Sequence, residues 1–260
     1  RKTEVIPQKV GEFKEIDLIP ETENILILTK GGYIKRLSPS SFKAQKRGGK
    51  GVLGLALREE DKVEHFLYLS SHDEVLFFTI LGRVFKIPAY EIPEVERQSF
   101  GRGILNFIEL TPEENITSMI STPKLRSNFG DHRGKYLIMA AKEGIIKKTD
   151  IKEFEIVRRS GLRAIKLGEG DELSFVKESQ GNDEVLLASS TGDVIRFRER
   201  EIRKMGRSAM GVKGMSLKTK SQKSRIKNGD NKENRIVGME VIEKSKSRIQ
   251  DSNLNLSNLG

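Results

Sequence analysis

The densest cluster of chemically useful side chains in this sequence is the heptad Gln45-Lys46-Arg47-Gly48-Gly49-Lys50-Gly51. It combines three cations and three glycines within seven residues. Glycine lets a loop bring its backbone N–H groups close to a ligand, and neighbouring cations attract negative charge. The heptad therefore predicts a loop that binds phosphate groups.

Basic residues also recur at matching places along the chain. Two sets can be counted from the same four glycines, Gly32, Gly82, Gly144 and Gly192. The hairpin cations stand four residues after each glycine and are Arg36, Lys86, Lys148 and Arg196. The loop cations stand 18 to 21 residues after each glycine and are Lys50, Arg102, Arg163 and Lys213. We expect each set to be spaced along one rim of the fold. For the hairpin cations a structural role, with long side chains lying over strand ends, stays open.

A rim of regularly spaced cations suits the phosphate backbone of a duplex, because each neutralised phosphate releases counterions. The chain has no Trp and only 6% aromatic residues, so stacking platforms for unpaired bases are not expected. Double-stranded DNA, held by its backbone and bent along a curved surface, fits better. Further cations near the two sets complete the candidate surface: Lys35, Arg97, Lys147, Arg158, Arg159 and Arg207.

Other chemical motifs are weak. Residues 49–54 satisfy a Gly-x-Gly-x-x-Gly pattern but lack the strand and helix that a dinucleotide site needs. His65, His72 and His132 are too far apart in sequence to suggest a metal motif, and the chain has no cysteine. The tyrosines lie in or beside apolar runs and are interpreted as packing residues. The sequence therefore predicts no catalytic residue in this chain.

The elements that must position the cations form an internal repeat. Four apolar runs, starting near residues 25, 75, 137 and 185, each end at a glycine and continue into a second strand-like run. This pattern is typical of a β-hairpin. Each repeat closes with a further candidate strand, at 63–69, 116–120, 173–176 and 236–241. Residues 15–19 resemble such a closing strand without a repeat before it.

Four strands in about 50 residues, recurring four times, are typical of a ring or array of four-stranded blades. One blade cannot bury both of its faces, so neighbouring blades must stack. The orphan strand indicates that blades share strands across their boundaries. We predict an all-β, propeller-like fold over residues 1–260 as a single domain, with almost no helix beyond a turn near 38–42. The stretch 216–234, rich in Lys, Ser and Asn, is expected to be an exposed loop.

Composition limits the classes of function further. The net charge is +10 and the pI about 9.6, which favours a polyanionic partner. Hydrophobic residues make up 36%, enough for a core, and no apolar run approaches the roughly 18 residues of a membrane span. The chain begins Arg1-Lys2-Thr3, without an initiator Met or an apolar leader, so we expect an excised piece of a longer protein.

The heptad 45–51 resembles the gyrase-A box of DNA gyrase A subunits, whose pattern is Gln-Arg-Arg-Gly-Gly-Lys-Gly, with Lys46 keeping the charge of the arginine. The flanking residues 32–36 and the degenerate copies at 97–104 and 158–165 fit the same family. The resemblance implies a C-terminal β-pinwheel, a propeller-like ring of four-stranded blades that exchange strands. It also implies that the basic outer edge wraps duplex DNA in a positive sense, so that ATP-driven strand passage introduces negative supercoils.

The same resemblance implies that the chemistry lies elsewhere. The cleavage tyrosine, the metal-binding carboxylates and the ATPase belong to other parts of the holoenzyme, so ATP and Mg²⁺ are expected there, and no cofactor or metal here. Implied partners are DNA, the rest of the gyrase A polypeptide and the gyrase B polypeptide in an A2B2 assembly, in a bacterial cytoplasm at the nucleoid and without a membrane. The family usually has six blades, whereas four repeats can be counted here, so the extent of wrapping stays open.

Two other functions stay open. One is the corresponding domain of topoisomerase IV, which decatenates DNA; the intact heptad argues against it, since those relatives have a degenerate box or none. The other is a propeller scaffold that binds acidic proteins. No Trp-Asp dipeptide or kelch-like double glycine recurs, which disfavours this scaffold.

Overall fold

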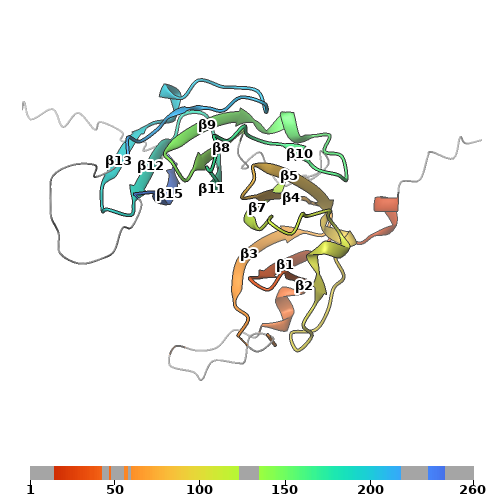
Figure 1. Ribbon diagram of the computed structural model, residues 1–260. Helices are drawn as coiled ribbons and strands as arrows, with labels where there is room; N and C mark the ends of the chain where they lie inside the picture. Colours follow the sequence, from red (N-terminus) through yellow and green to blue (C-terminus); the bar gives the residue numbers. More distant parts are fainter. Residues whose placement is uncertain are drawn as a thin grey trace, which may run out of the picture.

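The computed structural model describes residues 15–42, 47, 56–57, 60–122, 135–217 and 234–243. These residues form fifteen β-strands and six short 3₁₀ helices, with no α-helix among them. The strands make four small antiparallel sheets that follow one another around an open arc (Figure 1). In the described part of the chain, no helix is long and apolar enough to span a membrane. The expected all-β, propeller-like fold is confirmed.

Each sheet is built on one hairpin. The first has the order β3-β1-β2-β6, with β1 Glu23–Thr29, β2 Tyr33–Leu37, β3 Val63–Ser70 and β6 Arg102–Gly103. The second is β10-β5-β4-β7, with β4 Glu74–Thr79, β5 Arg83–Pro88, β7 Ile116–Thr122 and β10 Leu162–Arg163. The third is β11-β8-β9-β14, with β8 Tyr136–Ala141, β9 Ile145–Asp150, β11 Leu173–Ser179 and β14 Val212–Lys213. In the fourth, the described strands are β13-β12-β15, with β12 Glu184–Ser189, β13 Val194–Arg198 and β15 Ile236–Ile242.

The sheets stack face to face. Six consecutive residues of β1, from Asn24 to Thr29, are buried. Since successive strand residues point to opposite faces, both faces of β1 must be covered. One apolar cluster joins Leu26 and Leu28 of the first sheet to Phe77 and Phe85 of the second. Similar clusters join the second sheet to the third and the third to the fourth.

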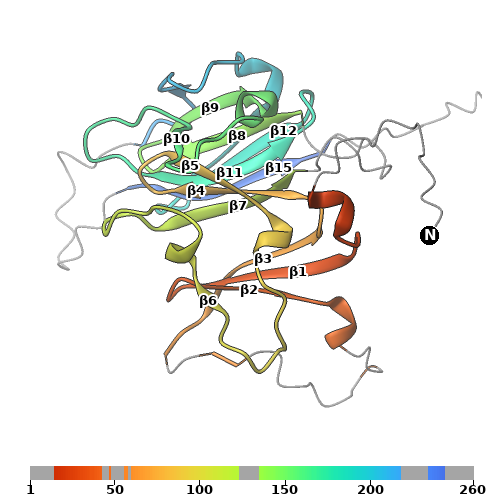
Figure 2. The ribbon, with the colours of Figure 1, turned by 90° about the vertical axis from the view of Figure 1, so that its right-hand side faces the viewer.

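Neighbouring blades exchange strands, as the sequence predicted. The two-residue strand β6 follows β5 in the chain but pairs with β2 of the first sheet. In the same way β10 pairs with β5, and β14 pairs with β9. Figure 2 shows β6 beside β2, at the edge of the first sheet. The closing strands β3, β7, β11 and β15 contact one another on the inside of the arc, so the donated strands lie at its outer perimeter (Figure 1).

The orphan closing strand predicted at 15–19 is wrong, because the structure has a 3₁₀ helix there, η1 Glu15–Leu18. A closing strand pairs with the first strand of its own hairpin, and the described residues contain no hairpin before this segment. The turn expected near 38–42 is the 3₁₀ helix η2 Pro39–Ser41. Equivalent helices follow the other hairpins and were not predicted: η3 Ala89–Glu91, η5 Ile151–Phe154 and η6 Glu199–Glu201, with η4 Ile104–Asn106 after β6.

Candidate nucleic-acid interface

Three of the four hairpin cations lie between blades. Arg36 Nε donates to the Ile92 carbonyl at 2.9 Å, and its Nη1 donates to Asn24 Oδ1 at 3.0 Å. Lys86 Nζ lies 2.8 Å from Glu74 Oε2 and also donates to the Glu155 carbonyl. In both cases one partner comes from the same sheet and the other from the following repeat. These side chains therefore fasten one blade to the next.

Lys148 makes the most deeply buried of these described pairs. Its ammonium group lies 3.6 Å from the carboxylate of Glu199 and donates to the Glu199 carbonyl at 3.2 Å. The Glu199 side chain is fully buried and also accepts hydrogen bonds from Ser179 Oγ and from the backbone N–H groups of Gly181 and Asp183. The Lys148 ammonium also lies 5.2 Å from the centre of the Tyr136 ring. Lys148 was predicted on the DNA-binding rim, whereas the structure places it inside the fold.

Arg196 differs from the other hairpin cations because its side chain is 63% exposed. It still pairs with Glu184, the first residue of β12. The geometry therefore supports a structural role for the hairpin cations, which the sequence had left open. A signal for it was present in the sequence, since a polar or aromatic partner stands just before each apolar run: Asn24, Glu74, Tyr136 and Glu184.

Lys35 and Lys147 were also predicted on the rim, and the structure buries both, with 1% and 0% of their surface exposed. Lys35 Nζ donates to the carbonyls of Ser99, Arg97 and Ala56 at 2.8, 3.3 and 3.3 Å. Lys147 Nζ donates to the carbonyls of Ala164 and Arg207, both at 2.7 Å. Burial lowers the pKa of the Lys147 ammonium to about 8. Neither side chain can reach DNA while it makes these bonds.

The loop cations have the opposite environment. Arg102, Arg163 and Lys213 are exposed and stand on the donated strands β6, β10 and β14 at the outer perimeter. The count along the sequence implied that these three cations are equivalent, but their positions in the strand register differ. Arg163 and Lys213 lie opposite the first residue after a hairpin glycine, whereas Arg102 lies opposite the second, Ile34. A shift of one residue turns a side chain to the other face of a strand.

Glycines before the donated strands explain the Gly-rich signature. Gly101, Gly161 and Gly211 have φ values of 84°, 78° and 115°, a conformation that glycine adopts far more readily than other residues. A Cβ at Gly101 would lie 2.5 Å from the Ile34 carbonyl oxygen, and one at Gly211 would lie 2.5 Å from that of Ile146. Glycine is therefore required where the loop crosses the edge of the preceding sheet.

A second column, which was not predicted, consists of the turn arginines Arg97, Arg159 and Arg207, of which Arg159 is exposed and the other two are half-buried. Each occupies the second position of a tight turn, closed by a backbone hydrogen bond over residues 96–99, 158–161 and 206–209. Each stands five residues after a buried apolar side chain, namely Ile92, Phe154 and Ile202. Arg47 stands five residues after Phe42 and is an exposed turn residue. Counting from the apolar residue would have revealed this column.

The turn arginines keep contacts with their own fold. The Arg97 guanidinium lies 5.9 Å from the centre of the Phe42 ring, and Arg207 Nε lies 3.5 Å from Glu153 Oε2. Arg158 and Arg159 are exposed. Of the predicted heptad only Arg47 is described, and Gln45, Lys46, Gly48, Gly49, Lys50 and Gly51 lie outside the described residues.

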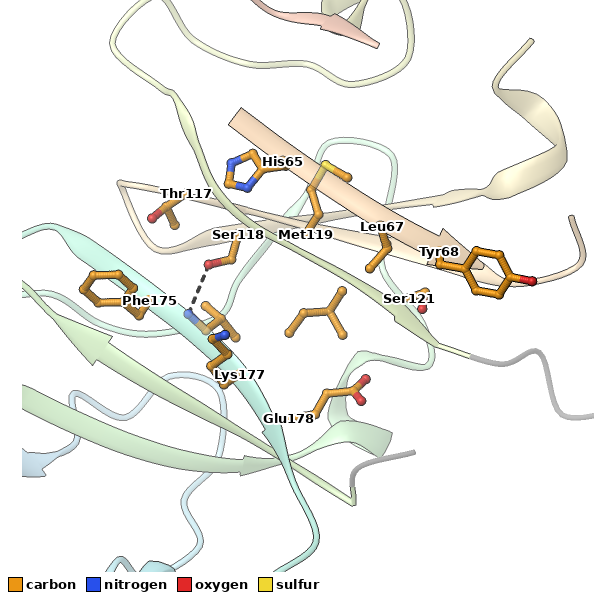
Figure 3. Close-up of a pocket in the computed structure, with 12 residues that line it drawn as sticks. His65, Leu67, Tyr68, Thr117, Ser118, Met119, Ser121, Phe175, Lys177 and Glu178 are labelled. Carbon is orange, nitrogen blue, oxygen red and sulfur yellow. Dashed lines mark hydrogen bonds between the residues drawn. The ribbon is translucent and has the colours of Figure 1, made fainter. Parts of the chain in front are cut away.

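The inside of the arc offers a different kind of surface. A cavity of about 490 Å³ is lined by β3, β7 and β11, with Leu67, Met119 and Phe175 among its apolar residues (Figure 3). Ser118 Oγ accepts a hydrogen bond from the backbone of Val176 across it at 3.1 Å. None of the candidate cations lines this cavity. In the part of the chain that the structure describes, no cluster of His, Asp or Glu could hold a metal ion.

Comparison with known proteins agrees with this architecture. A family model described as "DNA gyrase C-terminal domain, beta-propeller" matches residues 23–70, 73–123, 135–178 and 183–230, more than half of the chain. The DNA gyrase A protein of Staphylococcus epidermidis (strain ATCC 12228 / FDA PCI 1200) is 40% identical over 218 residues, 84% of this chain and 24% of that protein. That of Staphylococcus aureus (strain MRSA252) is 41% identical over 221 residues, again 84% and 24%.

Two solved structures have similar folds. The C-terminal domain of DNA topoisomerase IV matches with a TM-score of 0.66 and 26% identity, over 86% of this chain and 62% of that chain. A DNA gyrase A C-terminal domain matches with a TM-score of 0.62 and 26% identity, over 84% of this chain and 64% of that chain.

Proposed function

Because the chain belongs to the family of DNA gyrase C-terminal β-propeller domains, we propose that it binds duplex DNA along the outer perimeter of its blades and wraps it. The observation that carries this proposal is the exposure of Arg102, Arg163 and Lys213 on the strands donated to three successive sheets. Strand exchange repeats the same edge from blade to blade. A duplex that follows this edge passes an exposed cation on the donated strand of each of these three sheets, with Arg102 on the opposite strand face from Arg163 and Lys213.

The energetics favour several contacts over one strong site. Bending a duplex of 20–30 base pairs costs on the order of 1–6 kcal/mol, which one exposed cation cannot offset. Each neutralised phosphate adds affinity that falls with salt concentration. Exposed cations spread over a curved edge therefore bind and bend DNA together, without reading its sequence.

The activity of the whole protein is a wider proposal, since the chain spans 24% of its curated relatives. Acting with gyrase B and with the rest of the gyrase A polypeptide, the domain presents positively wrapped DNA for strand passage. ATP and Mg²⁺ act in those other parts, and this domain supplies no catalytic group. The site of action is the bacterial cytoplasm, at the nucleoid.

A topoisomerase IV domain is the second candidate, because one such domain matches the fold with a TM-score of 0.66. The curated relatives at 40–41% identity are gyrase A proteins, and the heptad 45–51 differs from the gyrase pattern at one residue only. Both observations favour gyrase.

The perimeter is tested with the triple variant Arg102→Ala, Arg163→Ala, Lys213→Ala. Relaxed circular DNA closed in the presence of the wild-type chain should show a topoisomer shift, and the triple variant should lose most of it. Lys177→Ala, an exposed cation on the inner strand β11, is the control and should behave as wild type. An unchanged shift with the triple variant would remove the perimeter from the binding surface.

Variants of the heptad 45–51 test whether the chain acts as a gyrase domain or as a topoisomerase IV domain. In a reconstituted enzyme, replacing Lys46, Arg47 and Lys50 with Ala should abolish negative supercoiling and spare ATP-independent relaxation. Full supercoiling by this variant would show that the heptad does not determine wrapping.

A further inference from the structure

Building on the proposed function, we propose that Lys35 and Lys147 are positioning residues that hold the turn arginines Arg97 and Arg207 in place for contact with DNA. Both lysines are the third residue after a hairpin glycine, one in the first sheet and one in the third. Neither touches DNA itself. They act through the backbone of the perimeter turns.

The hydrogen bonds run directly to those turns. Lys35 Nζ binds the carbonyls of Arg97 and Ser99, the second and fourth residues of the turn 96–99. Lys147 Nζ binds the carbonyl of Arg207, the second residue of the turn 206–209. In both cases a lysine on a strand of one blade binds the turn of the next repeat. The described acceptors of both ammonium groups are backbone carbonyl oxygens, so these bonds fix the backbone of the turns and leave the half-buried arginine side chains unbound by the lysines.

Lys147 links its turn to a donated strand as well. Lys147 also binds the carbonyl of Ala164, which directly follows the donated strand β10. A single buried ammonium thus joins the perimeter segments of two successive repeats. If a turn were displaced, the distance between the cations of the two repeats would change. One duplex can contact both cations only when that distance suits its path.

In the second sheet the perimeter turn is held in place without a lysine. Phe85 takes the equivalent position, and a Cβ at Gly161 would lie 2.8 Å from its ring. Arg83 Nη2 donates to the Ser160 carbonyl within the turn 158–161, while its Nη1 binds the buried carboxylate of Glu114. The turn of Arg159 is therefore held by Arg83, although Lys147 binds Ala164 in the same segment. Arg97, whose turn is bound by Lys35, is the internal control for Lys147.

The test is a pair of double-mutant cycles on DNA affinity, measured by gel shift with a linear duplex at fixed salt. Lys147→Met, which keeps the chain length and removes the donor, should weaken binding about threefold or more. Combined with Arg207→Ala, it should cost little beyond Arg207→Ala alone, because the turn has no cation left to position. Combined with Arg97→Ala, in a turn that Lys147 does not contact, the two losses should multiply. Lys147→Arg, which keeps donor N–H groups, should recover part of the affinity.

The outcome also separates this proposal from the proposed function. If the triple perimeter variant abolishes DNA binding but Lys147→Met leaves affinity unchanged, only the positioning role is overturned. Equal multiplication in both cycles would overturn it too. If Lys147→Met does not fold, Lys35→Met with Arg97→Ala carries the same test. Unfolding of both Met variants and of Lys147→Arg would assign the lysines to the stability of the fold alone and overturn the proposal.

Discussion

Lys148 and Arg163 belong to the same repeat, on β9 and β10, and lie in opposite environments. Lys148 is buried between blades and bound to Glu199, whereas Arg163 is exposed at the perimeter. Both recur in the other repeats, so recurrence alone does not distinguish them. The difference teaches that one column of cations holds the blades together and the other is available to a ligand.

The physical reason lies in which neighbour covers each position. A hairpin cation sits on a strand whose face meets the next blade, and a charge placed there is costly unless it is paired and hydrogen-bonded. The partners therefore come from the same repeat, as Glu74 does for Lys86, or from the following one, as Glu199 does for Lys148. A loop cation sits on a two-residue strand at the sheet edge, where water solvates it and no partner is required.

The largest effect should come from breaking the buried pair. Glu199→Ala leaves the Lys148 ammonium without its carboxylate and removes the acceptor of three further hydrogen bonds. We expect a loss of about 3–5 kcal/mol in the free energy of unfolding, measured by urea denaturation. Glu201→Ala, an exposed residue of the same 3₁₀ helix, is the control. A loss below about 1 kcal/mol would contradict the structural role of this column.

Titration of Lys147 should give the next largest effect. The pKa of Lys147 is lowered to about 8, first by burial and then by Arg207, with Glu153 opposing. An ordinary lysine titrates near 10.4, so between these values the unfolded state binds more protons and stability rises with pH. Relative to Lys147→Met, the wild type should gain up to about 3 kcal/mol from pH 8 to 10.5. A flat difference between the two unfolding curves would refute the shift.

The smallest effects should come from Arg196 and Arg163, one exposed arginine from each column. Arg196→Ala breaks its exposed pair with Glu184 and should cost less than about 1 kcal/mol of stability. Arg163→Ala should change stability by no more than about 0.5 kcal/mol but make the dependence of log affinity on log salt shallower by about one unit. The salt slope should be nearly unchanged by Arg196→Ala. Equal slopes for both variants would erase the distinction between the columns.

Much of this architecture follows from local patterns. Apolar runs that end at Gly32, Gly82, Gly144 and Gly192 fix four hairpins, because strand-forming residues followed by a glycine with positive φ can turn in few other ways. The basic composition and the glycine-rich loops likewise predict a surface for a polyanion. These features depend on residues close together in the sequence, so the sequence alone determines them.

Which cations form that surface was decided by tertiary structure. Lys147 and Lys148 are adjacent basic residues in the sequence, yet both are buried, because the following repeat supplies the carbonyls of Arg207 and Glu199 that bind them. Arg102 differs from Arg163 by one position in strand register, which no count along the chain reveals. Burial and register depend on a neighbouring sheet built from another repeat, and only the packing of the blades brings the two together.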